Sequence, residues 1–130
     1  MARYNKGARW ERAAKEALEK LGLQVYRVAG SKGVDLVIPR FAVEVKFRQE
    51  LPKTIRNAGY YYIQSLSGFC ARPLWSIIEP NMLPTETVEG FGPWENLVPE
   101  NGFLLLKSPG VPWIILGRLE VIKSLVGGEV

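Results

Sequence analysis

The stretch from Gly33 to Phe47, GVDLVIPRFAVEVKF, consists of two apolar runs separated only by Pro39 and Arg40. Two such runs joined by two turn residues predict an antiparallel β-hairpin. Charged side chains interrupt both runs: Asp35, which is the only aspartate in the chain, in the first, and a glutamate and a lysine in the second. Charged side chains rarely lie in apolar runs unless they are paired, bind a metal or take part in chemistry.

The alternation of the strands predicts which of these groups share a face. Residues two apart in a strand point to the same side of the sheet. In the second run, Glu44 and Lys46 therefore share the face opposite to Val43 and Val45. In the hairpin, Asp35 and Glu44 can converge on one side, and Lys46 then lies about 7 Å further along the strand from Glu44.

This arrangement suits a divalent metal beside a phosphodiester. Two hard carboxylate oxygens are typical ligands of Mg²⁺ or Mn²⁺, with water and phosphate oxygens completing the coordination shell. Lys46 could position an attacking water or stabilise charge on the phosphate. The alternative is a half-buried ion pair between Glu44 and Lys46 beside a turn aspartate, and the spacing by itself leaves both interpretations open.

The composition narrows the possible chemistry. A chain of 130 residues, 47% hydrophobic and 23% charged, is long enough for one domain with a substantial core. It has no apolar run that could span a bilayer and no secretory signal at its N-terminus. The single cysteine, Cys70, excludes an intramolecular disulfide framework and fits a reducing, cytoplasmic setting. The absence of histidine excludes imidazole bases and imidazole metal ligands.

The charge is distributed unevenly along the chain. The net charge is +4, but residues 1–56 carry +7 and residues 57–130 carry −3. The basic half contains the hairpin with its candidate site. A basic surface around a metal site favours a polyanionic partner such as nucleic acid. The alternative is that the lysines and arginines only keep the protein soluble.

The remaining pattern predicts further elements around the hairpin. A helix over Gly7–Leu21 has an apolar stripe at Trp10, Ala14, Ala17, Leu18 and Leu21, with Glu11 at its flank. The other predicted elements are a strand at Leu23–Val28, a helix at Lys53–Leu66, a strand at Leu74–Ile78, a hairpin of Phe103–Lys107 with Trp113–Leu116, and a helix at Leu119–Val126. Residues 79–102 form a long acidic loop, which we expect to be an insertion.

Four sequence blocks, in this order, resemble the archaeal-type Holliday junction resolvases of the PD-(D/E)xK nuclease superfamily. The blocks are Lys6-Gly7 with Glu11-Arg12, Tyr26 to Ser31, Gly33 to Val37, and Val43 to Lys46. Together they cover about residues 5–48. Their joint occurrence is far more specific than any single block, and beyond residue 50 the resemblance is topological only.

The resemblance implies a fold, an activity and a set of site residues. The fold would be α/β with a restriction-endonuclease-like core, a mixed central sheet flanked by helices, in a single domain over residues 1–130. The protein would be a homodimer that binds a four-way DNA junction and nicks two strands symmetrically with Mg²⁺, for which Mn²⁺ substitutes. Catalysis would rest on Glu11, Asp35, Glu44 and Lys46, and the metal would be held by Asp35, Glu44, the Val45 carbonyl and Glu11.

The predicted DNA-binding set combines the resemblance with the basic residues of the same half. It comprises Lys6, Arg9, Arg12, Arg27, Ser31, Lys32, Arg48, Lys53 and Arg56. Two other functions stay open at this stage: a restriction- or repair-type nuclease on the same fold, and a non-catalytic module that binds branched DNA. Proteins of this kind also occur in viruses, so the pattern leaves a cellular or viral source open.

Overall fold

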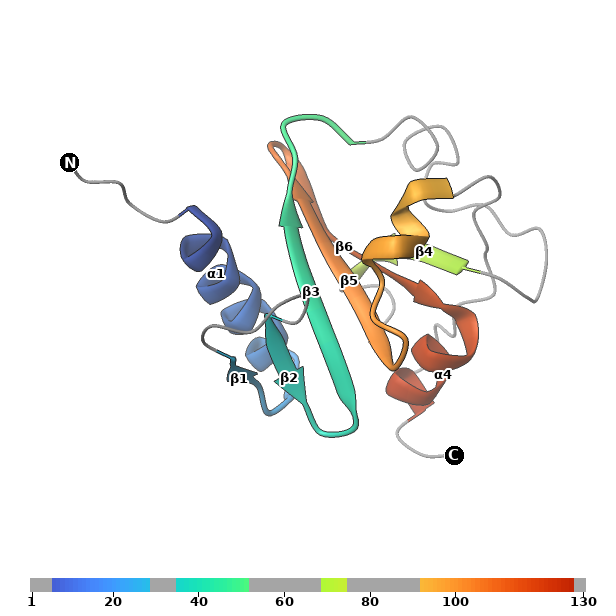
Figure 1. Cartoon of the computed structure of the whole chain (residues 1–130). Coiled ribbons are helices and arrows are strands. Elements are labelled where there is room, and N and C mark those ends of the chain that lie inside the picture. The colour runs from blue at the N-terminus through green and yellow to red at the C-terminus, as the bar shows by residue number, and fades with distance from the viewer. Residues whose placement is uncertain (1–5, 29–34, 52–68, 75–91, 128–130) are drawn as a thin grey trace.

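The computed structural model describes residues 6–28, 35–51, 69–74 and 92–127, which form a mixed sheet with helices packed on it (Figure 1). The strands lie in the order β1-β2-β3-β5-β6-β4. They span Tyr26–Arg27 (β1), Leu36–Ile38 (β2), Phe41–Phe47 (β3), Phe69–Pro73 (β4), Gly102–Ser108 (β5) and Val111–Arg118 (β6). The helices are α1 (Lys6–Lys20), the 3₁₀ helix η1 (Gly92–Leu97) and α4 (Leu119–Gly127). The predicted α/β class is confirmed, whereas the helix predicted at 53–66 lies outside the described residues.

The predicted hairpin is formed by β2 and β3, which pair antiparallel with Leu36 opposite Val43. Pro39 and Arg40 make the turn, and Arg40 adopts a positive φ of 77°. On its other side β3 pairs in parallel with β5, and β5 pairs antiparallel with β6. The predicted C-terminal hairpin is therefore confirmed, and the strand that carries Glu44 and Lys46 has a partner on both sides.

Helix α1 ends in a cap that shortens the next strand. Gly22 has a φ of 93°, and its N–H donates to the Glu19 carbonyl at 2.9 Å. The Leu23 N–H donates to the Leu18 carbonyl at 3.3 Å, so the two bonds form a Schellman cap. Because Leu23 serves this cap, the strand predicted at Leu23–Val28 is reduced to Tyr26–Arg27.

The sheet separates two apolar clusters. On one face, α1 contributes Ala14 and Leu18, which pack with Val43 and Val45 of β3. The other face holds a second cluster, which comprises Leu51, Ala71, Leu104, Leu106, Ile114 and Leu116. Cys70 is fully buried in the first cluster, as expected of a small core residue. In the described parts of the chain, no helix is long and apolar enough to cross a membrane.

The strand predicted at Leu74–Ile78 does not begin at Leu74. The observed strand β4 ends at Pro73 and pairs with β6, and Leu74 follows it in a helical conformation. Residues 75–78 lie outside the described part. Leu74 is still buried, but burial alone does not make a residue part of a strand. Because β4 is an edge strand, it tolerates Pro73 at its end.

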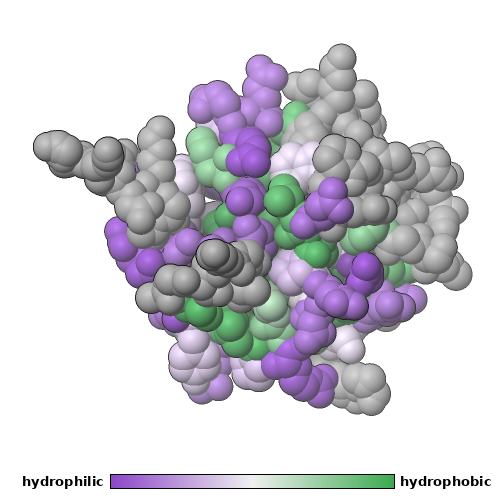
Figure 2. Space-filling model, in the orientation of Figure 1, coloured by the Kyte–Doolittle hydropathy of each residue, from purple (hydrophilic) through white to green (hydrophobic). Residues whose placement is uncertain are grey.

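The predicted acidic loop is described only from residue 92 onward. There, η1 lies on the opposite side of the sheet from α1 (Figure 1). Trp94, Leu97 and Val98 pack against the second cluster, so this segment covers part of the sheet. In Figure 2, hydrophilic side chains lie around apolar ones that show at the centre of the visible face. Residues 79–91 lie outside the described part.

The junction of β3 and β5 gives a first prediction. A Cβ placed on Gly102 would overlap the backbone of Ala42, its partner in β3. We expect Gly102→Ala to destabilise the protein by roughly 2–3 kcal/mol, because backbone atoms cannot move aside without separating the strands. Urea unfolding followed by circular dichroism measures this.

The matched control is Gly110→Ala in the β5–β6 turn. Gly110 has a φ of 76° and open space around it, so alanine there meets only backbone strain of roughly 1 kcal/mol. Equal losses in the two variants would contradict a steric role for Gly102.

Candidate active site

Asp35 is held at the point where β2 begins. Its N–H donates to the Val43 carbonyl at 2.9 Å, and its carbonyl accepts the Val28 N–H at 3.0 Å. Its side chain accepts the Val45 N–H at 2.8 Å through Oδ2. Within a strand, the N–H and C=O of one residue point to the same side. The Val45 carbonyl therefore lies on the β3 edge next to the Asp35 carboxylate, as the predicted metal site requires.

Glu44 and Lys46 form an ion pair on the neighbouring part of β3. Lys46 Nζ lies 3.1 Å from Glu44 Oε2. The Glu44 side chain is almost fully buried, and the Lys46 side chain is about one-third exposed. The ion pair between Glu44 and Lys46, which the sequence offered as the alternative to a metal site, is thus present. It leaves the second carboxylate oxygen of Glu44, Oε1, buried without a hydrogen-bond partner.

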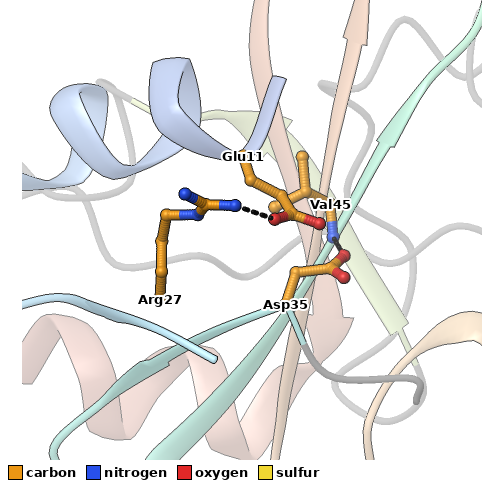
Figure 3. Close-up of polar contacts among 4 residues, drawn as sticks. All are labelled: Glu11, Arg27, Asp35 and Val45. Carbon is orange, nitrogen blue, oxygen red and sulfur yellow. Dashed lines mark hydrogen bonds and ion pairs between the residues drawn. The ribbon is translucent and has the colours of Figure 1, made fainter. Parts of the chain in front are cut away.

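Helix α1 brings Glu11 to the same place. Arg27 Nη2 of β1 donates to Glu11 Oε1 at 3.2 Å. The carboxylates of Glu11 and Asp35 point toward one another, and the Val45 N–H closes the group (Figure 3). Two of the predicted catalytic residues, Glu11 of α1 and Asp35 at the start of β2, thus meet beside Val45 of β3. Arg27, predicted only as a DNA contact, is also the ionic partner of Glu11.

The crowding of carboxylates changes their acidity. Burial raises the pKa of Glu11, the neighbouring Asp35 carboxylate raises it further, and Arg27 opposes the rise. Burial is also the largest cause that raises the pKa of Glu44. Lys46 opposes that rise, whereas the charge of Asp35 adds to it. Both glutamates are therefore held with less favourable solvation than on the surface, as is common at functional sites.

The available oxygen atoms fit a divalent cation. A buried carboxylate oxygen with no partner, such as Glu44 Oε1, is costly in an apolar setting and is normally satisfied. Asp35 and the Val45 carbonyl supply further hard oxygen donors on the same edge. Among the described side chains, no group of three or more carboxylates, cysteines or histidines could hold a metal alone. The candidate ligands are thus the carboxylates of Asp35 and Glu44 together with the Val45 carbonyl. This combination of oxygen donors suits Mg²⁺ or Mn²⁺.

An aromatic stack fixes helix α1 against β3. The Trp10 ring lies parallel to that of Phe47, with centroids 4.4 Å apart and an interplanar angle of 8°. Trp113 meets Trp10 edge to face at 6.3 Å. Trp10 precedes Glu11 and Phe47 follows Lys46, so the stack joins the two elements next to their catalytic candidates. The sequence did not lead us to predict this contact. The only indication was the aromatic residue next to Glu11 and the one next to Lys46.

Four of the predicted DNA-binding residues lie among the described side chains. Arg9, Arg12, Arg27 and Arg48 are exposed. The guanidinium group of Arg48 lies 5.6 Å from the ring centroid of Trp94, so it links the end of β3 to η1. The side chains of the other five predicted residues, Lys6, Ser31, Lys32, Lys53 and Arg56, are not described.

One comparison with known proteins agrees with the resemblance. No model of a protein family matches the chain. The chain is similar to the crossover junction endodeoxyribonuclease Hjc of Methanocaldococcus jannaschii, with 55% identity over 38 residues. This match spans 29% of each of the two chains. Among solved structures, it is similar to Archaeoglobus fulgidus Hjc, a Holliday junction resolvase, with 21% identity over 97% of this chain and 98% of that one and a TM-score of 0.43. The similarity to the curated resolvase confirms the resemblance that the sequence blocks indicated.

The raised pKa of Glu44 predicts how stability depends on pH. The folded state favours the protonated carboxyl group, so its contribution is present below the unfolded pKa and is lost as pH rises through the folded pKa. In metal-free protein at pH 7.5, Glu44→Gln should therefore raise the melting temperature, by roughly 2–5 °C. Calorimetry in the presence of a chelator measures the shift.

The gain from Glu44→Gln should shrink at pH 4, where the wild-type carboxyl group is largely protonated. Glu16→Gln on the exposed side of α1 is the matched control and should leave the melting temperature unchanged at either pH. A lower melting temperature for Glu44→Gln at pH 7.5 would show that the Lys46 ion pair outweighs the burial of the charge.

Proposed function

We propose that the chain is a metal-dependent endonuclease that resolves four-way DNA junctions by paired, symmetric nicks. The observation that carries this proposal is the contact of Glu11 with Asp35 beside the Glu44–Lys46 ion pair of β3, whose glutamate feels the charge of Asp35. The basic character of residues 1–56 and the similarity to a named crossover junction endodeoxyribonuclease support the same conclusion. Cleavage is then hydrolysis of a phosphodiester in a polyanionic substrate.

The metal, proposed to be Mg²⁺ with Mn²⁺ as a substitute, would be held by Asp35, Glu44 and the Val45 carbonyl. Bound there, it would supply Lewis acidity toward the phosphate and the attacking water. Lys46 uses one donor on Glu44 and has two more for a phosphate oxygen or for the attacking water. Its one-third exposure leaves the ammonium group accessible to substrate.

Glu11 and Arg27 are proposed to act together. Their contact keeps the guanidinium group of Arg27 beside the site, at 3.2 Å from Glu11 Oε1. The guanidinium has further N–H donors that a phosphate can accept, and a planar fork suits that geometry. Glu11 would thus position Arg27 and place a third carboxylate near the metal.

The substrate geometry leads to the proposed assembly. Symmetric nicking of a junction requires two equivalent sites, and the described residues form one. A homodimer related by a two-fold axis supplies the second with the same local geometry. The proposed partners are therefore a second copy of the chain and branched DNA, in the cytoplasm of a cell or of a host cell.

The central prediction concerns cleavage of a mobile four-way junction. With Mg²⁺ the wild-type protein should nick two opposing strands, and chelation should abolish this. Asp35→Asn and Glu44→Gln should each lower the cleavage rate by at least about 10³-fold, because each removes a charged oxygen ligand. Denaturing gels of end-labelled junctions measure the rates.

Three observations would contradict the proposal at different levels. Equal cutting of linear duplex of the same sequence would remove the junction selectivity and favour a restriction- or repair-type nuclease. Tight junction binding without any cleavage in Mg²⁺ or Mn²⁺ would favour a non-catalytic module. Full activity of both Asp35→Asn and Glu44→Gln would refute the site assignment.

A separate prediction concerns the exposed arginines. Arg48→Gln should weaken junction binding and lower the slope of log affinity against log salt by about one, because one phosphate contact is lost. Lys123→Gln is the control, since Lys123 is exposed on α4, which packs against β4, β5 and β6 rather than against β3. Fluorescence anisotropy over a salt series measures both, and equal slopes would exclude Arg48 from the interface.

A further inference from the structure

Arg48 continues the row of charged side chains that begins with Glu44 and Lys46. Its N–H donates to the Lys107 carbonyl at 2.9 Å, which extends the parallel ladder of β3 with β5 by one residue. Because residues two apart in a strand share a face, Arg48 lies on the same face as Glu44 and Lys46. It follows Lys46 by two residue rises, about 7 Å. The face that carries the ion pair therefore also carries an exposed arginine.

Trp94 of η1 supports this placement independently. Its ring centroid lies 5.6 Å from the guanidinium group of Arg48. Trp94 packs against the second cluster, which includes Leu104 and Leu106. These two leucines are the register partners, in β5, of the glutamate and the lysine of the ion pair, so they share its face. In agreement, η1 lies on the side of the sheet opposite to α1 (Figure 1).

Several contacts hold Arg48 in one position. Its Nη1 donates to the Phe47 carbonyl at 2.9 Å, and the Trp94 ring covers one face of the guanidinium group. The next residue is also fixed, because Ser108 Oγ donates to the Gln49 carbonyl at 3.1 Å. A guanidinium group has five N–H donors in one plane. The donors that remain at its edge therefore have a defined direction.

The charge of Arg48 differs from that of its neighbours in having no acidic partner. Arg27 is paired with Glu11 at 3.2 Å. Lys46 is paired with Glu44 at 3.1 Å. Among the residues that the structure describes, no carboxylate pairs with Arg48. An unpaired, oriented guanidinium group is well suited to bind a phosphate.

We propose that Arg48 and Trp94 form a second phosphate subsite on the η1 side of the sheet. Trp94 holds the guanidinium group against a phosphate of the cut strand, one or two nucleotides from the scissile phosphodiester. The separation of about 7 Å from Lys46 corresponds to about two steps of 3.4 Å along a DNA strand. This inference rests on the proposed function and adds Trp94 to it as a positioning residue.

The contact between ring and cation is not needed to attach η1 to the sheet. Leu97 and Val98 of the same segment also pack against the second cluster, so the segment has apolar anchors besides Trp94. If the contact only stabilised the fold, loss of the Trp94 ring would act on DNA binding as loss of Leu97 does. Variants at the two positions therefore separate the two roles.

The test uses the whole chain and compares Trp94→Leu with Trp94→Phe and Arg48→Lys. Leucine keeps an apolar side chain on the second cluster, whereas phenylalanine also keeps an aromatic face for the cation. Lysine keeps the charge and removes the planar group, at an exposed position where the substitution does not disturb folding. Leu97→Ala is the matched control. Junction binding is measured by fluorescence anisotropy over a salt series in a chelator, and circular dichroism follows thermal unfolding.

We expect Trp94→Leu and Arg48→Lys each to bind the junction roughly 3- to 10-fold more weakly. Trp94→Leu should also lower the salt slope by roughly half to one, because the phosphate contact of Arg48 is weakened. Trp94→Phe should stay within about twofold of wild type. Leu97→Ala should lower the melting temperature and keep affinity and slope. In an Arg48→Gln background, Trp94→Leu should cause no further loss of affinity, because both changes remove one contact.

Three results would overturn the inference and leave the nuclease proposal intact. They are an equal loss of affinity in Leu97→Ala, an undiminished effect of Trp94→Leu in the Arg48→Gln background, and wild-type affinity of Arg48→Lys. The last result decides the question even if Trp94→Leu does not fold. Failure of the wild-type protein to bind or cut the junction would instead remove the proposed function, and the wild-type measurement alone shows this.

Discussion

The hydrogen bonds around Asp35 are the constraint on which the rest of the site depends. Its backbone is bound to Val28 on one side and to Val43 on the other, and its carboxylate accepts the Val45 N–H. These bonds fix the main chain and the side chain together at the start of β2. The pairing of β2 with β3 ends next to Asp35. Beyond it, the edge of β3 carries the Val45 carbonyl, which lies beside the Asp35 carboxylate that the Val45 N–H holds in place.

The surrounding fold holds these groups at some cost in stability. Glu44 is buried with one oxygen unpaired, and its burial raises its pKa. Lys46 offsets part of this cost, and the tight pairing of β3 with β5, which requires glycine at position 102, keeps the strand in place. Groups on central strands are positioned more precisely than groups on loops, which is what binding a cation and a phosphate demands.

Much of this was predictable because it follows from local rules. The stripe of α1 and the β2–β3 and β5–β6 hairpins follow from periodicities of 3.6 and 2. The strand predicted at Leu74–Ile78 was wrong at Leu74, since an apolar run does not reveal where its backbone partner lies. β1 was shorter than predicted because Leu23 takes part in the cap of α1. An apolar run alone indicates neither this cap nor the pairing of β4 with β6.

The sequence by itself determined the identity of the reactive groups. With no histidine and a single aspartate, any metal site had to use Asp35 and glutamates, and the position of Glu44 two residues before Lys46 put both on one face. Only the tertiary structure decided which groups meet. Glu11 reaches Asp35 and Arg27 because Trp10 stacks on Phe47 and fixes α1 across the sheet. Such contacts join residues distant in the chain, and no local spacing records them.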